Sequence, residues 1–460
     1  MSFGCAIILA AGKGTRMKSR LPKVLHKLGG RYMVEHVINT VEELGVTEFI
    51  AVVGHEADMV QEALGKRVSY AMQQEQLGTG HAVMMALPYI KEEEGHVLVV
   101  CGDTPLIRPE TLKKLWDHHL EAQAACTVLS AILPDPTGYG RIVRKQDDTL
   151  SKIVEQKDAL PEELSIQEIN TGTYCFDLKH LKEMIKNIAS NNAQGEYYLT
   201  DMVALLGSRG LKVNAVLAED FEETKGINSR SQLAEAERIM RMRKISCLMD
   251  DGVTIIDPAS TFIEQDVIIG RDTVVEPFTF LRGKTVIGSE CTIGPHADIK
   301  DSVLGDGVWV NRTVMIEASV GDQCHIGPFA YLRPGAELNR EVKIGDFVEI
   351  KKSVIGEQSK VPHLTYVGDS EVGKNVNIGC GTITCNYDGK HKFRTVIKDG
   401  SFIGSNTNLV APVEVGEGAI VGAGSTITKD VPSDALAVAR GKQLNIPGWA
   451  AKKRQQREEE

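Results

Sequence analysis

The chain has 460 residues, of which 42% are hydrophobic and 25% are charged, values ordinary for a globular protein of about two to four domains. Its net charge of −10 argues against binding nucleic acid or an anionic membrane over the whole surface. No apolar run approaches the roughly 18 residues of a membrane-spanning helix, so we expect no membrane span.

The start of the chain, residues 1–14, has no basic segment before its short apolar run, and Gly12 ends that run. It therefore predicts a buried strand and not a signal peptide. The nine cysteines are scattered, and none belongs to a CxxC pair. This pattern favours reduced thiols and a cytoplasmic location.

Up to about residue 250, short apolar runs alternate with amphipathic segments. The runs predict strands at Ala6–Ala11, Phe49–Val53, Val97–Cys101, Thr127–Ile132 and Thr173–Phe176. The segments between them include predicted helices at Met33–Leu44 and Pro109–Ala122. This alternation predicts a Rossmann-like α/β domain with a largely parallel sheet covered on both faces. Ligands of such sheets bind beyond the carboxyl ends of the strands.

Residues 230–250 carry apolar residues near helical spacing with charges between them, which predicts a long helix. We expect this helix to link a domain of residues 1–229 to a domain of residues 251–460. A terminal helix of the first domain is the alternative.

Beyond residue 250, leucine becomes scarce, and aliphatic–glycine pairs recur in steps of 6, 12 or 18 residues, as at Ile269, Ile287 and Ile293. A six-residue period with one inward aliphatic residue predicts an all-β, left-handed parallel β-helix. A polar segment, residues 385–392, fills the longest gap between these pairs. The last residues, 452–460, mix basic and acidic side chains and predict a disordered tail.

A glycine-rich segment, residues 9–17, follows the first predicted strand. Gly12 and Gly14 allow backbone N–H groups to approach an anion, and Arg16 and Lys23 add positive charge. The segment is neither GxGxxG nor GxxxxGK[ST], which disfavours a dinucleotide-binding fold and a P-loop. Asp103 follows an apolar strand, so its carboxylate should lie at the ligand edge of the sheet.

These residues occur in a series that resembles the sugar-1-phosphate nucleotidyltransferases. The series continues with residues 21–23, 76–80, 102–103, 138–141, 153–155, 168–172 and 226–228. Together with the repeats, nearly the whole chain is similar to the bacterial bifunctional N-acetylglucosamine-1-phosphate uridylyltransferases and glucosamine-1-phosphate N-acetyltransferases. The resemblance implies that acetyl-CoA, UTP and Mg²⁺ are used to make UDP-N-acetylglucosamine, a precursor of peptidoglycan and lipopolysaccharide.

For uridylyl transfer, the resemblance implies that Asp103 and Asn228 hold Mg²⁺ and that Arg16 and Lys23 stabilise charge on the phosphates. The contacts it implies to UTP and UDP-N-acetylglucosamine are Leu9, Ala10, Ala11, Gly12, Lys23, Gln73, Gly78, Thr79, Gly140, Glu155, Asn170 and Asn228.

For acetyl transfer, the resemblance implies His363 as the general base, a role that suits an imidazole at neutral pH. Arg333 and Lys351 are 18 residues apart, one coil, and should stack as a phosphate site. A solvated charged face with carboxylate partners is the alternative for these two cations. The implied contacts to glucosamine 1-phosphate are Arg333, Lys351, Tyr366 and Asn377. The implied contacts to acetyl-CoA are Cys380, Asn386, Tyr387, Ser405, Ala423 and Arg440; Cys380 stands where the family often has alanine.

Two other functions stay open at this stage. One is a nucleotidyltransferase of a single activity, such as an ADP-glucose-type pyrophosphorylase, in which a shorter β-helix is regulatory. His363 and the Asn386-Tyr387 pair argue against it. The other is a scaffold or exchange-factor subunit without catalysis, against which Lys23, Asp103 and Asn228 argue. The resemblance also implies a homotrimer with acetyl sites between neighbouring subunits.

Overall fold

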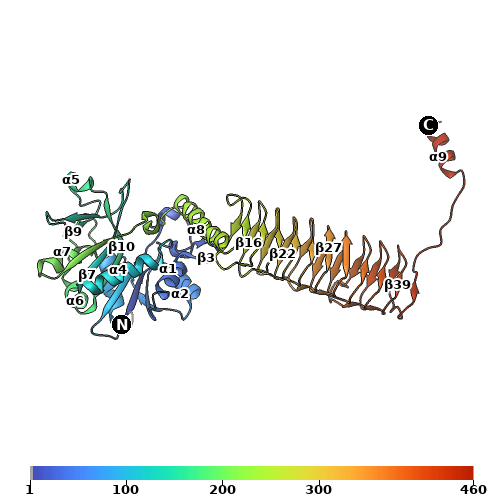
Figure 1. Cartoon of the computed structure of the whole chain (residues 1–460), viewed down its shortest axis with the longest axis horizontal. Helices are drawn as coiled ribbons and strands as arrows, with labels where there is room; N and C mark the ends of the chain where they lie inside the picture. The colour runs from blue at the N-terminus through green and yellow to red at the C-terminus, as the bar shows by residue number, and fades with distance from the viewer. Residues whose placement is uncertain (1–3, 459–460) are drawn as a thin grey trace. The chain divides into compact units, whose positions relative to one another are not determined.

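The computed structural model describes residues 4–458, and the chain divides into two compact units (Figure 1). The first unit ends at Met240, and the second begins at Arg241. Within the described residues, no helix combines the length and apolarity that a bilayer crossing requires.

The first unit is built on a nine-stranded sheet whose main order is β11-β7-β10-β6-β1-β4-β5, with β8 and β9 attached through β10. Along this order the strands are parallel, except that β10 runs antiparallel to β6 and β7. The bounds are β1 Cys5–Leu9, β4 Glu48–Val53, β5 Ser69–Met72, β6 His96–Cys101, β7 Cys126–Ile132, β8 Arg141–Arg144, β9 Leu150–Val154, β10 Glu168–Asp177 and β11 Val213–Leu217. All five predicted strands are present, and the predicted α/β class is confirmed.

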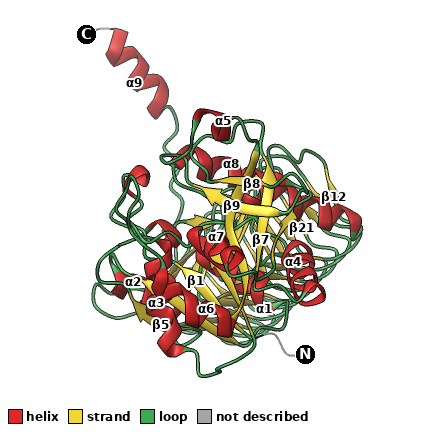
Figure 2. Ribbon diagram, turned by 90° about the vertical axis from the view of Figure 1, so that its left-hand side faces the viewer, coloured by secondary structure: helices red, strands yellow, loops and turns green. Residues whose placement is uncertain are grey.

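Helices cover both faces of this sheet (Figure 2). Successive residues of a strand point to opposite faces, so Ile7 of β1 packs into one core and Ile8 into the other. Residues of α1, α2 and α4 contribute to the core that contains Ile8, and residues of α3, α6 and α7 contribute to the core that contains Ile7. The bounds are α1 Met33–Glu42, α2 Ala57–Leu64, α3 Thr79–Ala86, α4 Pro109–Ala122, α5 Pro161–Leu164, α6 Leu178–Met184 and α7 Asp201–Ser208.

A long helix, α8, runs from Arg230 to Asp250, and the boundary between the two units falls inside it. Its first half belongs to the first unit, where Ala236, Ile239 and Met240 share a buried cluster with Leu28 and Met33. The division into functional domains of residues 1–229 and 251–460 stays a prediction.

The second unit consists of three parallel sheets of 11, 10 and 9 strands. They begin at β12 Thr254–Ile255, β13 Phe262–Ile263 and β14 Ile268–Ile269, and they end at β41 Leu436–Ala437, β40 Thr426–Ile427 and β38 Val413–Val415. Residues one coil apart are paired, as Ile269 is with Ile287. Ile287, Ile293 and Ile299, at steps of six, are at most 1% exposed. This is the hexapeptide β-helix that the repeats predicted.

The described part of the tail predicted to be disordered, residues 452–458, is helical, and its disorder stays a prediction. Residues 449–458 form helix α9, Trp449–Glu458, in which no residue is buried. Its alanine, lysine, arginine and glutamine residues all favour helix. Residues 459 and 460 of the predicted tail lie outside the described residues.

Two candidate active sites

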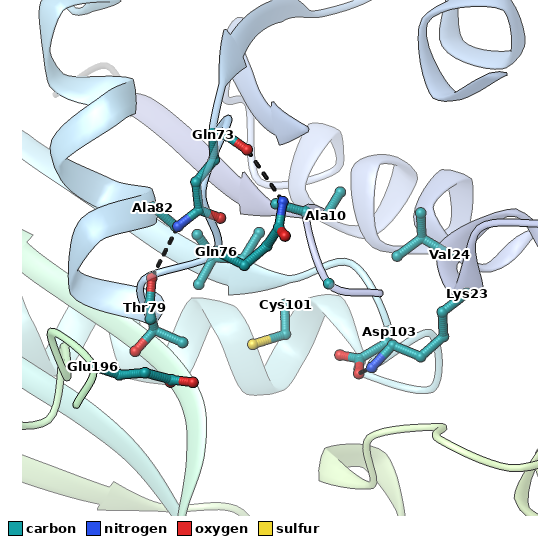
Figure 3. A pocket seen from close by; sticks show the side chains of 14 residues that line it. Ala10, Lys23, Val24, Gln73, Gln76, Thr79, Ala82, Cys101, Asp103 and Glu196 are labelled. Carbon is teal, nitrogen blue, oxygen red and sulfur yellow. Dashed lines mark hydrogen bonds and ion pairs between the residues drawn. The ribbon is translucent and has the colours of Figure 1, made fainter. Parts of the chain in front are cut away.

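The first candidate site is a cavity of about 250 Å³ in the first unit (Figure 3). Strands β1 and β6 pair in parallel and end opposite one another at Leu9 and Cys101, so the residues that follow them meet at one edge of the sheet. The cavity is lined by Leu9, Ala10, Ala11, Gly12, Lys23, Val24, Gln73, Gln76, Gly78, Thr79, Ala82, Cys101, Asp103 and Glu196.

Nine of these lining residues are among those predicted from the sequence. The five that were missed are Val24, Gln76, Ala82, Cys101 and Glu196. Cys101 could have been found, because it ends the strand that precedes Asp103. Glu196 comes from a loop far away in the chain, and nothing local in the sequence points to it.

The predicted metal ligands converge on a lysine. The Lys23 ammonium donates a hydrogen bond to Oδ2 of Asp103 and another to Oδ1 of Asn228, at 2.9 Å. The Lys23 and Asp103 side chains are only 15% and 17% exposed. Both oxygens therefore face one cation in a partly desolvated place. Within residues 4–458, no group of three or more His, Cys, Asp or Glu residues could hold a metal.

At the other end of the cavity, the Gln73 amide is nearly buried and donates to the carbonyl of Gly78 at 3.1 Å. Gly78 has a φ of 106°, and a Cβ atom there would come within 2.6 Å of the Tyr197 carbonyl oxygen. The Thr79 hydroxyl accepts a hydrogen bond from the backbone of Leu199 at 3.1 Å. These contacts fix the turn that begins α3.

Gly140, Glu155 and Asn170 lie together but do not line this cavity. The Asn170 N–H donates to the Gly140 carbonyl at 2.9 Å, and a Cβ atom on Gly140 would lie 3.5 Å from the Glu155 carboxyl group. Burial raises the pKa of Glu155 above its usual value, although a hydrogen bond from Thr200 opposes the shift. Arg16 also does not line the cavity, and its side chain is exposed.

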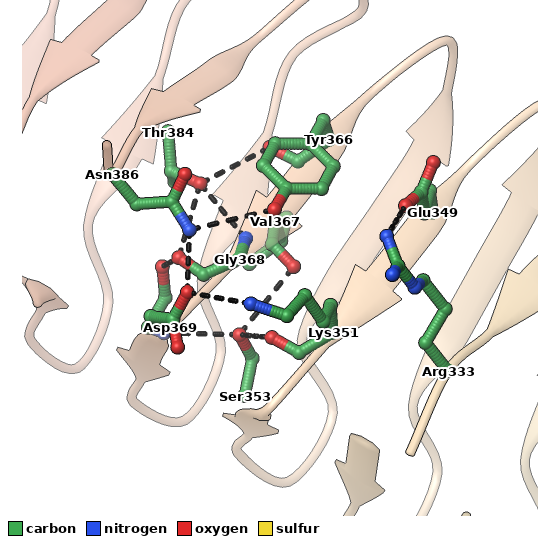
Figure 4. A network of polar contacts seen from close by, with 11 residues as sticks. Arg333, Glu349, Lys351, Ser353, Tyr366, Val367, Gly368, Asp369, Thr384 and Asn386 are labelled. Atoms are coloured by element: carbon green, nitrogen blue, oxygen red, sulfur yellow. Dashed lines mark hydrogen bonds and ion pairs between the residues drawn. The ribbon is translucent and has the colours of Figure 1, made fainter. Parts of the chain in front are cut away.

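The second candidate site lies on the coils of the β-helix (Figure 4). Its strands are β25 Tyr331–Leu332, β27 Lys343–Asp346, β28 Glu349–Lys351, β30 Lys360–His363, β31 Tyr366–Gly368, β33 Asn377–Ile378 and β34 Ile383–Cys385. Leu332 pairs with Ile350, which puts Arg333 and Lys351 on adjacent coils.

Both cations have carboxylate partners. Such partners were expected if the two cations belong to a solvated charged face and not to a phosphate site. Arg333 lies 2.7 Å from Glu349, and Lys351 lies 3.0 Å from Asp369. The face is not simply solvated, however, because Lys351 is only 9% exposed. Buried lysines usually have a specific partner or a ligand.

Asp369 holds several predicted residues together. It accepts hydrogen bonds from Lys351 and from the Asn386 amide, at 2.5 Å, and the same amide donates to the Tyr366 hydroxyl at 3.4 Å. Residues predicted for two different substrates, Tyr366 and Asn386, are therefore neighbours. Lys392, which was not predicted, lies close to Lys351, and the proximity of this second cation lowers the pKa of Lys392 below its usual value.

His363 ends β30 opposite Asp346, which ends β27. Nδ1 of His363 lies 2.5 Å from Oδ1 of Asp346, and the imidazole side chain is 55% exposed. The hydrogen bond lowers the pKa of Asp346 below its usual value. Asp346 was also missed, although its position 17 residues before His363, about one coil, could have revealed it.

Four of the residues predicted for acetyl-CoA follow one corner of successive coils. The Cys380 carbonyl accepts from the Asn406 N–H at 2.7 Å, and the Ser405 carbonyl accepts from the Gly424 N–H at 2.8 Å. The Arg440 guanidinium donates to the Ala423 carbonyl at 2.9 Å. Tyr387 lies in the polar segment and is 59% exposed, and Asn377 pairs with Lys360 of β30.

Comparisons with known proteins cover both units. Residues 6–158 match the model of the MobA-like NTP transferase domain, and residues 394–429 match that of the bacterial transferase hexapeptide (six repeats). The bifunctional protein GlmU of Geobacillus sp. (strain WCH70) is 56% identical, with 96% of each chain covered. The GlmU proteins of Desulfitobacterium hafniense (strain DSM 10664 / DCB-2) and Clostridioides difficile (strain 630) are each 53% identical. Those two comparisons cover 99% and 98% of this chain and 100% and 98% of theirs.

This similarity extends through both candidate sites, so it disfavours a nucleotidyltransferase with a shortened, regulatory β-helix and a scaffold subunit. The chain shares more than half of its residues with these GlmU proteins over nearly its whole length, and it has both a nucleotidyltransferase domain and a hexapeptide β-helix. It therefore belongs to the bifunctional GlmU family. It is an enzyme of UDP-N-acetylglucosamine synthesis that combines uridylyltransferase and glucosamine-1-phosphate acetyltransferase activities.

Proposed function

We propose that the two activities use the two sites described above, acetyl transfer on the β-helix and uridylyl transfer in the cavity of the first unit. The observation that carries the uridylyl assignment is the convergence of Asp103, Asn228 and Lys23 at the ligand edge of the sheet. A triphosphate needs concentrated positive charge at such a place. The cavity beside it joins this charged end to the Gln73 and Thr79 end.

Uridylyl transfer then requires one bond to form and one to break. An oxygen of N-acetylglucosamine 1-phosphate attacks the α-phosphorus of UTP, and the bond to the leaving pyrophosphate breaks. Lys23 would stabilise the phosphate charge, and the Gly12 turn would present backbone N–H groups to it. Gln73, Gly78 and Thr79 would hold the uracil, while Gly140, Glu155 and Asn170 would bind the sugar. Arg16, which is exposed, would contribute only if it turns toward the phosphates.

The donor set of Asp103 and Asn228 fits Mg²⁺. This ion takes oxygen ligands, often one or two from the protein and the rest from water and phosphates. The shared contact with Lys23 indicates that the two oxygens face a common cation position. Mg²⁺ bound by them would neutralise charge on the triphosphate, and Lys23 would then be released to contact the phosphates.

In the acetyl-transfer site, His363 would remove a proton from the ammonium of glucosamine 1-phosphate. The amine nitrogen then attacks the thioester carbonyl of acetyl-CoA, the C–S bond breaks, and coenzyme A leaves as the thiolate and takes up a proton. Asp346 accepts from Nδ1, which leaves Nε2 for the substrate. Arg333, Lys351 and Lys392 form a cationic group suited to the phosphate.

A trimer would complete this site from a neighbouring subunit. Its support is an exposed apolar corner of the β-helix, where Phe278, Phe329, Phe347 and Leu364 are each more than 50% exposed and Phe329 stacks on Phe347. A cytoplasmic location is supported by nine cysteines that are all free. Sedimentation analysis would measure the trimer.

Asp103→Ala tests the uridylyl site and its metal. We expect uridylyl transfer to be abolished or nearly so, since the triphosphate charge is no longer neutralised. Acetyl transfer by the same preparation should be near wild type. EDTA added to the wild-type enzyme should produce the same separation of the two activities. If Asp103→Ala reduced both activities equally, misfolding would explain the loss and the site assignment would fail.

A further inference from the structure

Arg141 is the largest of the side chains that are essentially fully buried among the described residues, with only 2% of its surface exposed. It begins β8, beside the residues proposed to bind the sugar. Within residues 4–458, no carboxylate lies close enough to form an ion pair with its guanidinium. A cation is rarely buried in this way unless hydrogen bonds hold it in a particular geometry.

The guanidinium closes the turn formed by residues 138–141. Nη1 donates to the carbonyl of Tyr139, and Nη2 donates to Oε1 of Gln156 at 2.9 Å. The same Oε1 atom accepts the N–H of Gly138 at 3.2 Å. Arg141 and Gly138 thus share one acceptor, and the planar guanidinium satisfies two acceptors that a single ammonium could not reach in the same geometry.

This turn lies between the residues proposed to bind the sugar and the segment that leads to the proposed metal ligand Asn228. On one side, Gly140 accepts the N–H of Asn170 and lies against Glu155. On the other side, the Tyr139 hydroxyl lies near Gly226 and Asp103, and burial together with the charge of Asp103 raises the pKa of Tyr139 above its usual value. A shift of the turn would therefore move the bound sugar phosphate relative to Asp103 and Asn228, which lie on other segments of the chain.

We propose that Arg141 is a positioning residue for uridylyl transfer, which fixes the 138–140 turn and thereby aligns the sugar phosphate with the Asp103–Asn228 pair. The proposal rests on the sugar-binding roles proposed above for Gly140 and Glu155. It goes beyond them in assigning the alignment to a buried side chain that does not touch the substrate.

The test is steady-state kinetics of Arg141→Met and Arg141→Lys, with N-acetylglucosamine 1-phosphate and UTP varied separately. Misplacement of about an ångström can cost up to about 10²-fold, so we expect kcat/KM for the sugar phosphate to fall by about 10- to 10²-fold. The KM for UTP should stay close to wild type, because its proposed contacts lie on other segments. Arg141→Lys should not restore the wild-type value. The melting temperature of the same preparation, compared with that of the wild-type enzyme, serves as the measure of folding.

Arg144→Met is the matched control. Arg144 lies on the same strand, and its guanidinium is 2.7 Å from Glu168 and is not bonded to the turn. This variant loses an ion pair but should keep the wild-type KM for the sugar phosphate. Gln156→Met removes the shared acceptor from a less buried residue, and it should reproduce the sugar-selective defect even if Arg141→Met does not fold.

The outcomes separate this inference from the proposed sugar site. If Glu155→Gln impairs use of the sugar phosphate but the Arg141 and Gln156 variants do not, Arg141 has no positioning role. If Glu155→Gln also leaves the sugar-phosphate KM unchanged, the proposed sugar site itself is wrong. A defect of equal size in Arg144→Met, or equal losses toward UTP and the sugar phosphate, would indicate general destabilisation and would overturn the inference.

Discussion

Nδ1 of His363 lies 2.5 Å from Oδ1 of Asp346, and the two residues face one another across adjacent coils of the β-helix. This contact fixes the ring and leaves Nε2 as the nitrogen that can meet a substrate. The hydrogen bond from His363 lowers the pKa of Asp346, so the carboxylate is ionised throughout the neutral range. An ionised carboxylate also stabilises the imidazolium that forms when the base takes up a proton.

Replacement of His363 by alanine should remove the base of acetyl transfer. A positioned general base typically contributes about 10²–10⁴-fold, so we expect kcat for acetyl transfer to fall within that range. Uridylyl transfer and the melting temperature should be unchanged, because the side chain is more than half exposed. Release of free thiol from acetyl-CoA measures the first rate, and release of pyrophosphate measures the second. A stable His363→Ala enzyme with undiminished acetyl transfer would show that the base lies elsewhere.

Asp346 should act only through His363. Asp346→Asn keeps the size of the side chain but removes its charge, and it should lower acetyl transfer less than His363→Ala does. In the His363→Ala background, Asp346→Asn should have no further effect, since residues that act as a unit are not additive. The comparison needs the four rates of a double-mutant cycle. An equal loss in both backgrounds would mean that Asp346 contributes independently of the histidine.

The proposed sites divide into parts that the sequence could predict and parts that it could not. Asp103 was predictable, because an apolar strand directly precedes it and parallel strands end at one edge. The placement of Arg333 and Lys351 on adjacent coils followed from the coil period. The contacts of Asp369 and Glu349 were not predicted, because carboxylates on a solenoid are usually solvated and nothing local distinguishes these two. Asp346, about one coil before His363, could have been predicted from the coil period.

Burial of a charged residue is harder still to predict. Arg141 would ordinarily be placed on the surface, since arginine is almost never fully buried. Only the fold brings Tyr139 and Gln156 to its guanidinium.

The end of the first domain can be located by truncation. A fragment of residues 1–229 removes Ala236, Ile239 and Met240, which share a buried cluster with Leu28 and Met33. A fragment of residues 1–240 keeps that cluster and should therefore melt at a higher temperature. Both fragments should lose acetyl transfer, and the longer one should retain uridylyl transfer. Equal melting temperatures would contradict the role of α8 in the first unit, and a folded but inactive 1–240 fragment would contradict the site assignment.

Glu155 should make stability depend on pH. Burial raises its pKa in the folded protein above the ordinary value of 4.5, so the ionised form costs stability above that raised value. Below 4.5 the carboxyl group is protonated in both states, and the cost disappears. Glu155→Gln should therefore raise the melting temperature at neutral pH, and the gain should shrink as the pH falls through the raised pKa. Thermal melts at several pH values measure this difference. A gain that stays constant down to pH 4 would contradict the assigned burial effect.

The central claim is that one chain carries two independent active sites, and a mixing assay tests it most directly. Asp103→Ala and His363→Ala enzymes are each incubated with UTP, acetyl-CoA, glucosamine 1-phosphate and Mg²⁺, and UDP-N-acetylglucosamine is measured. Each variant alone should form little product. Their mixture should restore product formation, because the first variant supplies N-acetylglucosamine 1-phosphate and the second converts it. A mixture as inactive as its components, from variants that are both folded, would contradict two separable sites.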